Sequence, residues 1–243
     1  MSNGLKDKVV AITGASSGIG EVTARHLAEN GAHVLVGARR IDRLQKLVSA
    51  LQAAGARAEY QALDVTDRAS VTRFVDFAVE RFGRLDALVN NAGVMPLSPL
   101  AALKLDEWDR MIDVNIKGVL NGIAAALPVF EDQGCGHVVN TSSIAAYYVM
   151  PAGAIYCATK KAVNAITEGL RLEAPHIRTT IVSPGVTESE LADTVTHAET
   201  AALVAAFRTE PMPADAIARA VGFAIAQPQS VDVSEIIVRP TGK

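Results

Sequence analysis

The stretch from Lys8 to Gly20 reads Lys-Val-Val-Ala-Ile-Thr-Gly-Ala-Ser-Ser-Gly-Ile-Gly, and it decides the fold class. A short apolar run ends at the first glycine, and helical periodicity begins at Ile19. In a turn between a strand and a helix, Gly14 permits the bend, Gly18 lets backbone approach a pyrophosphate, and Gly20 allows close helix packing. The helix N-terminus then presents N–H groups to phosphates. The spacing G-x-x-x-G-x-G differs from the commoner G-x-G-x-x-G, and a purely structural turn is the alternative.

Outward from this turn, strand patterns alternate with helical patterns along the whole chain. Apolar strands that alternate with helices indicate a parallel sheet covered on both faces. We therefore expect one α/β domain, residues 1–243, with a Rossmann-type, doubly wound parallel sheet of about seven strands. The expected strands are Lys8–Thr13, His33–Ala38, Ala58–Leu63, Leu85–Val89, His137–Thr141, Arg178–Val182 and Glu235–Val238. The expected helices are Ile19–Asn30, Asp42–Ala54, Asp67–Phe82, Asp106–Phe130 (possibly disturbed by Pro128), Ala154–Glu173 and Pro213–Ala226.

The segment 186–210 follows neither period cleanly and is rich in Thr, Ala and Glu. A stretch of this length in a compact domain is often a binding element. We expect a mobile lid over the substrate site.

Composition excludes several classes of protein. The chain has 243 residues, a net charge of -3 and 49% apolar residues, which is ordinary for a globular protein without a basic footprint for nucleic acid. Residues 1–8 are polar, so we expect no secretory leader. The apolar runs are broken by Gly, Pro or charge short of a membrane span. Cys135 and Cys157 lack metal-ligand spacing, so we expect reduced thiols in a cytoplasmic protein with no metal.

Polar residues follow the third and fourth strands. Asp64 and Val65 end the third strand, where we expect hydrogen bonding and packing at an adenine edge; a helix N-cap or turn Asp is the alternative. Asn90, Asn91, Ala92 and Gly93 end the fourth strand, and paired amides beside small residues suit backbone held close to a cofactor. A plain Asn-rich turn would have the same sequence.

Tyr156 is followed four residues later by Lys160, which places both side chains on one helix face. A phenol with a pKa of about 10 needs a shift of ~3 units, or ~4 kcal/mol, to act near neutral pH. One cation at ~4 Å, in an effective dielectric of about 20, supplies ~4 kcal/mol, while desolvation of the phenolate opposes it. The pair therefore suits acid/base chemistry, although a surface pair has the same spacing.

Three further polar residues are candidates. Ser142 and Ser143 end the fifth strand, where a hydroxyl could hold a substrate oxygen or cap a turn. Asn115 lies in an otherwise apolar helical stretch, where a buried amide must find partners. It could bridge helix and sheet or anchor a proton relay.

The chain carries a series of short motifs, which are T-G-A-S-S-G-I-G from Thr13, L-D-V from Leu63, N-N-A-G from Asn90, Asn115, N-T-S-S from Asn140, Y-C-A-T-K from Tyr156 and S-P-G-V-T from Ser183. In this order and spacing the motifs resemble the short-chain dehydrogenase/reductase family in its single-domain branch, over nearly the full chain. The C-terminal I-I-V-R-P-T is similar to a subgroup of NADPH-dependent aldehyde and ketone reductases that includes clavulanate-pathway enzymes.

The resemblance implies an oxidoreductase that moves a hydride between nicotinamide and a carbonyl or alcohol carbon. Tyr156 would be the acid/base, and Lys160 would lower its pKa and bind the nicotinamide ribose. The family serine lies thirteen residues before the tyrosine, which selects Ser143 over Ser142. Asn115 would anchor a water between Lys160 and solvent. The nicotinamide contacts would come from Pro184, Gly185, Val186 and Thr187, and phosphate contacts from Gly14, Ser16, Ser17, Gly18, Ile19 and Gly20.

The end of the second strand predicts NADP(H) as the cofactor. An acidic residue there normally binds the ribose 2′-hydroxyl of NAD, but alignment with the family places Ala38 at that position. Arg39 and Arg40 follow, and a guanidinium suits a 2′-phosphate. Because Ser16 and Ser17 are neutral, we expect Arg39 to dominate; the alternative is that both arginines are solvated at the start of the next helix.

The substrate is expected to be a small hydrophobic carbonyl or alcohol. The residues expected near it are mostly apolar: Met95, Ala145, Tyr148, Met150 and Leu191 beside Ser143, with Val94, Pro96 and Val186. The family implies a homotetramer or homodimer through the helices at Asp106 and Ala154. The main alternative is a catalytically inactive NADP-binding regulator, which typically lacks the tyrosine or lysine. Extended-branch epimerases have a longer C-terminal domain, and enoyl reductases space Tyr and Lys further apart.

Overall fold

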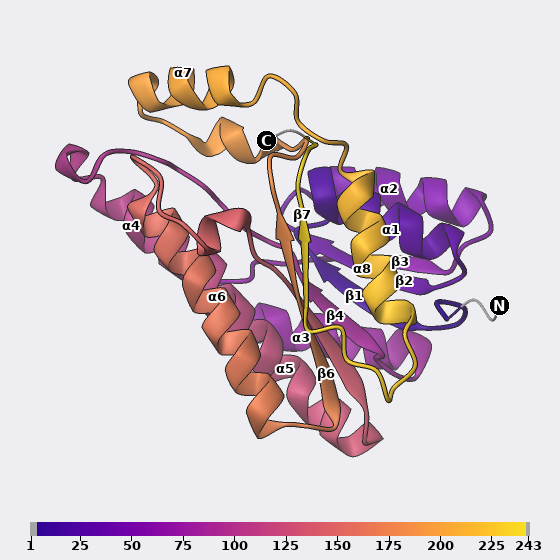
Figure 1. Cartoon of the computed structure of the whole chain (residues 1–243). Helices are drawn as coiled ribbons and strands as arrows, with labels where there is room; N and C mark the ends of the chain where they lie inside the picture. The colour runs from indigo at the N-terminus through magenta and orange to yellow at the C-terminus, as the bar shows by residue number, and fades with distance from the viewer. Residues whose placement is uncertain (1–3, 242–243) are drawn as a thin grey trace.

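The computed structural model describes residues 4–241; residues 1–3 and 242–243, part of the expected domain and its polar N-terminus, lie outside the described residues. Within 4–241, seven strands form one parallel sheet in the order β3-β2-β1-β4-β5-β6-β7 (Figure 1). This order confirms the predicted Rossmann-type sheet: the strand order runs outward in opposite directions from the neighbouring strands β1 and β4. The strands are β1 (Val9–Thr13), β2 (His33–Ala38), β3 (Ala58–Ala62), β4 (Ala87–Asn90), β5 (Gly136–Thr141), β6 (Ile177–Pro184) and β7 (Glu235–Val238).

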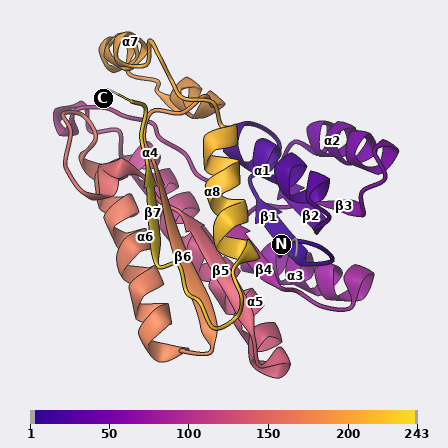
Figure 2. The ribbon, with the colours of Figure 1, turned by 45° about the vertical axis from the view of Figure 1, so that its right-hand side comes forward.

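Helices cover both faces of the sheet (Figures 1 and 2). One face is packed by α1 (Gly18–Glu29), α2 (Ile41–Ala53) and α8 (Asp215–Ala226), whose apolar residues share one buried cluster with the strands. The other face is packed by α3 (Arg68–Phe82), α5 (Gly118–Gln133) and α6 (Ala154–Glu173) around a second cluster that contains Phe74 and Phe130. The two apolar layers fix the strand ends at which polar residues collect.

The expected helix 106–130 is interrupted in the structure. It consists of α4 (Leu105–Ile112), a π-helical turn (Asp113–Lys117) and α5, and the α-helix continues past Pro128 to Gln133. The expected disturbance at Pro128 is therefore wrong in position, because the irregular hydrogen bonding lies at Asn115. A π turn within an α-helix often marks a functional position.

The helical stretch Leu105–Gln133, with the π turn inside it, is the one helix among the described residues that is long and apolar enough to cross a membrane. The mean hydropathy of its 18-residue window is 1.2. The helix meets this criterion although Gly, Pro and charged residues interrupt its apolar runs. Its buried side packs on α3 and the sheet, as a covering helix does, so its length and composition are weak evidence for a span.

The segment 186–210 is more regular than its sequence indicates. It contains a 3-10 turn (Glu190–Thr194) and α7 (Ala198–Phe207), and α7 projects beyond the end of the sheet (Figure 1). The helix escapes prediction because its apolar residues surround it instead of forming one stripe; Leu203 and Phe207 are exposed. Two further 3-10 turns are Leu100–Ala102 and Ile144–Ala146.

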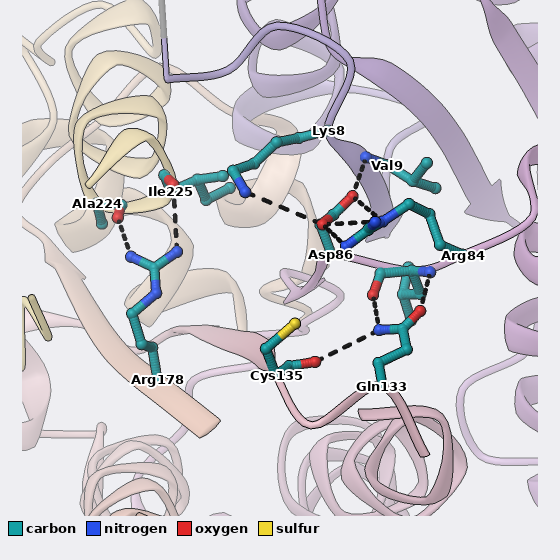
Figure 3. A network of polar contacts seen from close by, with 10 residues as sticks. Lys8, Val9, Arg84, Asp86, Gln133, Cys135, Arg178, Ala224 and Ile225 are labelled. Carbon is teal, nitrogen blue, oxygen red and sulfur yellow. Dashed lines mark hydrogen bonds and ion pairs between the residues drawn. The ribbon is translucent and has the colours of Figure 1, made fainter. Parts of the chain in front are cut away.

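The amino ends of the strands are joined by a polar network (Figure 3). Asp86 accepts a hydrogen bond from the Val9 N–H at 2.8 Å and is ion-paired with Arg84. The buried Arg178 donates to the carbonyl oxygens of Ala224 and Ile225 at the end of α8. A cation suits this negative end of the helix, so these contacts hold the frame from the side opposite the candidate site.

Candidate active site

A cleft of about 970 Å³ opens at the carboxyl ends of the strands, beside the point where the strand order reverses. Its walls come from the glycine-rich turn, the ends of β2 to β6, the start of α6 and the segment after β6. Most residues predicted to hold a cofactor line it: Gly14, Ser16, Ser17, Gly18, Ile19, Arg39, Arg40, Asp64, Val65, Asn91, Ala92, Gly93, Tyr156, Lys160, Pro184, Gly185 and Thr187. The predicted Gly20 and Val186 are not among its lining residues.

The glycine-rich turn needs its glycines for space as well as conformation. Gly14 has a φ of +68°, and a Cβ there would come within 2.7 Å of the Ala92 Cα. At Gly20 a Cβ would lie 2.5 Å from both the Gly14 carbonyl oxygen and the side-chain amide nitrogen of Asn91. A side chain at either position would therefore force the turn away from its neighbours, including the end of β4.

The first turn of α1 has the features of a phosphate-binding site. Ser17 is the N-cap residue, but its side chain makes no capping hydrogen bond, so the first N–H groups of the helix are not satisfied by a cap. Gly18 and Ile19 line the cleft at this end of the helix. The uncapped helix N-terminus therefore fits the pyrophosphate of a dinucleotide.

Asn91 and Thr13 fasten this turn to β4. The Asn91 side chain donates to the carbonyl oxygens of Thr13 and Gly14 at 3.1 and 3.2 Å. The backbone N–H groups of Asn91 and Ala92 both donate to the Thr13 hydroxyl. The amide is thus part of the frame that shapes the cleft, and its plain-turn alternative does not describe these contacts.

Asp64 forms a local turn beside the cleft. Its carboxylate accepts from the Thr66 N–H at 3.0 Å and from the Thr66 hydroxyl at 2.7 Å, and these bonds lower the pKa of Asp64. The N-cap of α3 is Asp67. Asp64 therefore matches the turn alternative while still lining the cleft.

The arginines at the end of β2 differ from expectation. Arg40 donates through Nε to the Ser16 hydroxyl at 3.1 Å and through Nη2 to the Ser17 hydroxyl at 2.7 Å. Its Nη1 is ion-paired with Glu190 at 2.6 Å, and Arg43 pairs with the other oxygen of that carboxylate at 2.6 Å. Arg40 is therefore not left to solvent, and the glycine-rich turn does have a basic neighbour. Arg39 is exposed, without a hydrogen bond or ion pair within residues 4–241.

Tyr156 and Lys160 lie one helical turn apart on α6 and face the cleft. Both are buried, and the Lys160 Nζ lies 5.8 Å from the centre of the Tyr156 ring. The ammonium donates to the Thr141 carbonyl oxygen at 2.8 Å, at the end of β5. This contact ties the helix to the strand that carries Ser142 and Ser143.

Burial controls the protonation of both groups. It raises the pKa of Tyr156 to about 12, and a hydrogen-bonding contact with Ser143 opposes this rise. Burial also lowers the pKa of Lys160 to about 8. The sequence estimate gave the lysine enough charge to lower the tyrosine pKa from ~4 Å. In the structure the net shift of the Tyr156 pKa is upward, because desolvation of the buried phenol dominates and Lys160 is not among the groups that lower it.

The two serines have different partners. The buried Ser142 hydroxyl donates to the Asn164 side-chain oxygen at 2.6 Å and contacts the Lys160 carbonyl at 3.3 Å. The Ser143 hydroxyl accepts from the Ala145 N–H at 3.1 Å and lies beside Tyr156. Both line the cleft, and Ser143 is the hydroxyl in hydrogen-bonding contact with Tyr156.

Asn115 is buried in the π turn and does not line the cleft. Its side chain exchanges two 2.9 Å hydrogen bonds with the Val94 backbone and donates to the Thr159 hydroxyl at 3.1 Å. It therefore bridges the helix, the segment after β4 and α6. The side chain matches the structural-bridge alternative.

The predicted substrate residues separate into two groups. Met95 and Ala145 are buried with Val94 and Tyr156, and Met150 and Leu191 pack against this cluster. Leu191 also lines the cleft, whereas Tyr148 is exposed and does not. Most of the expected substrate side chains therefore lie behind the cleft wall or outside it.

Sequence reasoning missed several charged residues that line the cleft, Arg43 and Arg208 among them. Arg43 and Glu190 form the ion pairs described above, and Arg208 lines the cleft and donates to the Thr187 carbonyl oxygen at 2.6 Å. No local pattern could have found the Arg40–Glu190 pair, because the two residues lie 150 positions apart. No group of three or more His, Cys, Asp or Glu able to hold a metal occurs in the described part of the chain.

Comparisons with known proteins agree with this geometry. The family model for short chain dehydrogenase matches residues 8–200. An uncharacterized oxidoreductase of Staphylococcus saprophyticus is 47% identical, with 99% of each chain covered. A solved alcohol dehydrogenase from Thermococcus sibiricus, in complex with 5-hydroxy-NADP, is 33% identical with a TM-score of 0.87 and 98% of each chain covered. A short chain dehydrogenase/reductase from Burkholderia phymatum, in complex with NAD, is 28% identical with a TM-score of 0.88, covering 96% of this chain and 89% of the other.

Proposed function

The chain belongs to the short-chain dehydrogenase/reductase family of oxidoreductases, and on that premise we propose that it interconverts a ketone or aldehyde and its alcohol with NADP(H), using Tyr156 as the acid/base. The observation that carries the proposal is that the candidate catalytic residues and the candidate phosphate site line one cleft. Tyr156, Ser143 and Lys160 come from two elements and line the same cleft as the uncapped N-terminus of α1. A dinucleotide held by its pyrophosphate at α1 would share this cleft with Tyr156.

Ser143 and Tyr156 would handle the reacting oxygen. The Ser143 hydroxyl donates to it, where negative charge develops during reduction. The Tyr156 hydroxyl supplies the proton that completes the alcohol, and a pKa of about 12 keeps this proton in place at neutral pH. In the reverse reaction, alcohol oxidation, the Tyr156 oxygen must receive the proton of the alcohol. When bound, the cofactor supplies or accepts the hydride.

Lys160 would hold the cofactor ribose and the charge balance of the site. Its ammonium is fixed by the Thr141 carbonyl, and its pKa of about 8 leaves it mostly protonated at pH 7. Two of its three protons remain to donate toward the cleft. Asn115 supports it indirectly, because its bond to Thr159 fixes the helix turn just before the lysine.

The preference for NADP(H) rests on the basic end of β2. Ala38 offers no carboxylate to a ribose 2′-hydroxyl, and Arg40 and Arg39 line the adjoining cleft wall. Guanidinium groups make charge-assisted hydrogen bonds to phosphate. Because Arg40 already lies over Ser16 and Ser17, we assign it the leading role in holding a 2′-phosphate, with Arg39 as the second contact.

The substrate side favours a compact, largely apolar carbonyl compound. Val94 and Leu191 belong to the apolar cluster and line the cleft, as Tyr156 does; Leu191 is part of the segment 186–210 that we propose as the lid. The proposed assembly is a homodimer or homotetramer through α4–α5 and α6. Large apolar side chains exposed on these helices support it: Leu105, Ile112, Leu120 and Leu172.

An inactive NADP-binding regulator is the competing function, and one assay separates the two. The protein is incubated with NADPH and a panel of aldehydes and ketones while nicotinamide absorbance is followed. We expect oxidation of NADPH that depends on one class of carbonyl. Tight NADPH binding with no turnover on any member, at high enzyme concentration, would support the regulator.

A further inference from the structure

Glu190 extends from the lid across the cleft to the basic end of β2. Its carboxylate is held by the Arg40 and Arg43 guanidinium groups at 2.6 Å each. A hydrogen-bonding contact with Ser17 adds to these, and together they lower the pKa of Glu190 to about 2. The group is therefore an anion at every pH at which an enzyme of this kind works.

The neighbouring lid residue lies over the glycine-rich turn. A Cβ on Gly18 would come within 3.2 Å of the Ser189 Cβ, so the lid backbone is close to the start of α1. Within the lid, Arg208 donates to the Thr187 carbonyl oxygen at 2.6 Å, which joins the two ends of the segment. Glu190 thus reaches the arginines from a lid segment that is docked on the turn.

The donors that hold Glu190 are those available to a cofactor phosphate. Arg40 uses Nε and Nη2 on the Ser16 and Ser17 hydroxyls and Nη1 on the carboxylate. An anionic carboxylate and a phosphate need the same kind of donor, a forked guanidinium with adjacent hydroxyls. A phosphate at Arg40 must therefore displace Glu190 or stand beside its negative charge.

We propose that Glu190 determines cofactor specificity by competing with the 2′-phosphate for Arg40 and Arg43. The inference rests on the proposed use of NADP(H). Glu190 lowers the affinity for the phosphorylated cofactor relative to NAD(H), and it couples cofactor choice to the lid, because the phosphate must release the lid from the arginines to bind fully. The opposite arrangement is a strap, in which Glu190 keeps its ion pairs while the cofactor lies beneath it.

The direct test compares Glu190→Gln with Glu188→Gln. Both variants remove one negative charge from the lid, but Glu188 is exposed and has no ion pair among the residues that the structure describes. Dissociation constants are measured by calorimetry for NADPH, NADH and adenosine 2′,5′-bisphosphate. The pairs are 42–43% exposed on the side chains, so the expected effect is moderate.

We expect Glu190→Gln to bind NADPH and the bisphosphate about 3- to 10-fold more tightly than wild type, with NADH nearly unchanged. Glu188→Gln should resemble wild type. Equal effects of the two variants, or no change in the NADPH to NADH ratio, would overturn the proposal. Weaker NADPH binding by Glu190→Gln would overturn it in favour of the strap. If wild type binds neither cofactor, the failure is that of the proposed function instead.

A second readout is independent of cofactor chemistry. Hydrogen exchange of residues 187–194 is followed in wild type with and without adenosine 2′,5′-bisphosphate. Competition predicts faster exchange when the bisphosphate is bound, since the lid loses its ion pairs. Slower exchange in the same segment would contradict it.

Discussion

At the scale of single residues, the hydroxyl groups of Ser142 and Ser143 show how neighbours in sequence acquire different roles. Ser142 donates its proton to the half-buried Asn164 side chain, which joins the end of β5 to α6. Ser143 accepts from a backbone N–H and is in hydrogen-bonding contact with Tyr156. The contacts favour the same serine as the thirteen-residue spacing.

Replacing each serine separately tests this assignment. Ser143→Ala removes a donor at the position where charge develops, so kcat should fall about 10²- to 10³-fold with little change in NADPH binding. Ser142→Ala should cost less activity and more stability, because it leaves the half-buried Asn164 amide oxygen without its donor. Steady-state kinetics and urea unfolding of both variants measure the two effects. The reverse order of the kcat losses would assign the substrate oxygen to Ser142.

The basic residues at the end of β2 make a second residue-level prediction. Arg40→Ala should weaken NADPH binding about 10-fold or more and leave NADH almost unaffected, because a charge-assisted hydrogen bond is worth ~1.5–3 kcal/mol. Arg39→Ala should have a smaller effect, since Arg39 lacks the anchoring contacts of Arg40 within the described residues. Calorimetric titration of both variants with both cofactors decides the order. Wild type that binds NADH as tightly as NADPH would refute the assignment to a 2′-phosphate.

Protonation of the active site should be visible in the pH profile. The pKa of Tyr156 is about 12, so its proton is present throughout the neutral and mildly alkaline range. The pKa of Lys160 is about 8, so its charge is present below that pH and lost above it. We expect kcat/KM for carbonyl reduction to be level below pH 8 and to decline above it. A profile that already declines below pH 7 would place the titrating group elsewhere.

At the scale of elements, the interrupted helix and the lid show what local patterns miss. The helical period continues through 105–133, but the π turn at Asn115 arises because its side chain is fixed to Val94 and Thr159 from other elements. In the lid, α7 has no apolar stripe and lies over the cluster that contains Tyr156. Both features depend on distant partners, so periodicity alone could not locate them.

The order of the lid should depend on the hydrogen bond from Arg208 to the Thr187 carbonyl oxygen, which joins its two ends. Arg208→Ala removes the donor to the Thr187 carbonyl, so residues 186–210 should exchange amide hydrogens faster, and KM for the substrate should rise more than kcat falls. Arg219→Ala is the matched control, because Arg219 is exposed and pairs with Asp215 within α8. Hydrogen exchange and kinetics on both variants give the result. Unchanged exchange in Arg208→Ala would show that packing alone holds the lid.

At the scale of the whole molecule, the doubly wound parallel sheet and both covering layers follow from the sequence. Apolar strands with intervening helices allow few other arrangements, and the glycine-rich turn places the cleft. The candidate acid/base residues also follow, because Tyr156 and Lys160 lie on one helix. The pKa of Tyr156 did not follow, because it depends on burial by segments far away in the sequence. The Arg40–Glu190 contact did not follow either, since it joins two loops that only the folded sheet brings together.

The central claim is that Tyr156 transfers the proton in a hydride-transfer enzyme. The most direct measurement is the rate of NADPH-dependent carbonyl reduction by Tyr156→Phe, compared with wild type. The dissociation constant of the variant for NADPH is measured as well. The ring and its packing remain while the transferable proton is lost. We predict that turnover falls by at least about 10²-fold and that NADPH binding stays close to wild type. A variant that keeps more than about a tenth of wild-type turnover would contradict the account, because general acid/base catalysis contributes more than that.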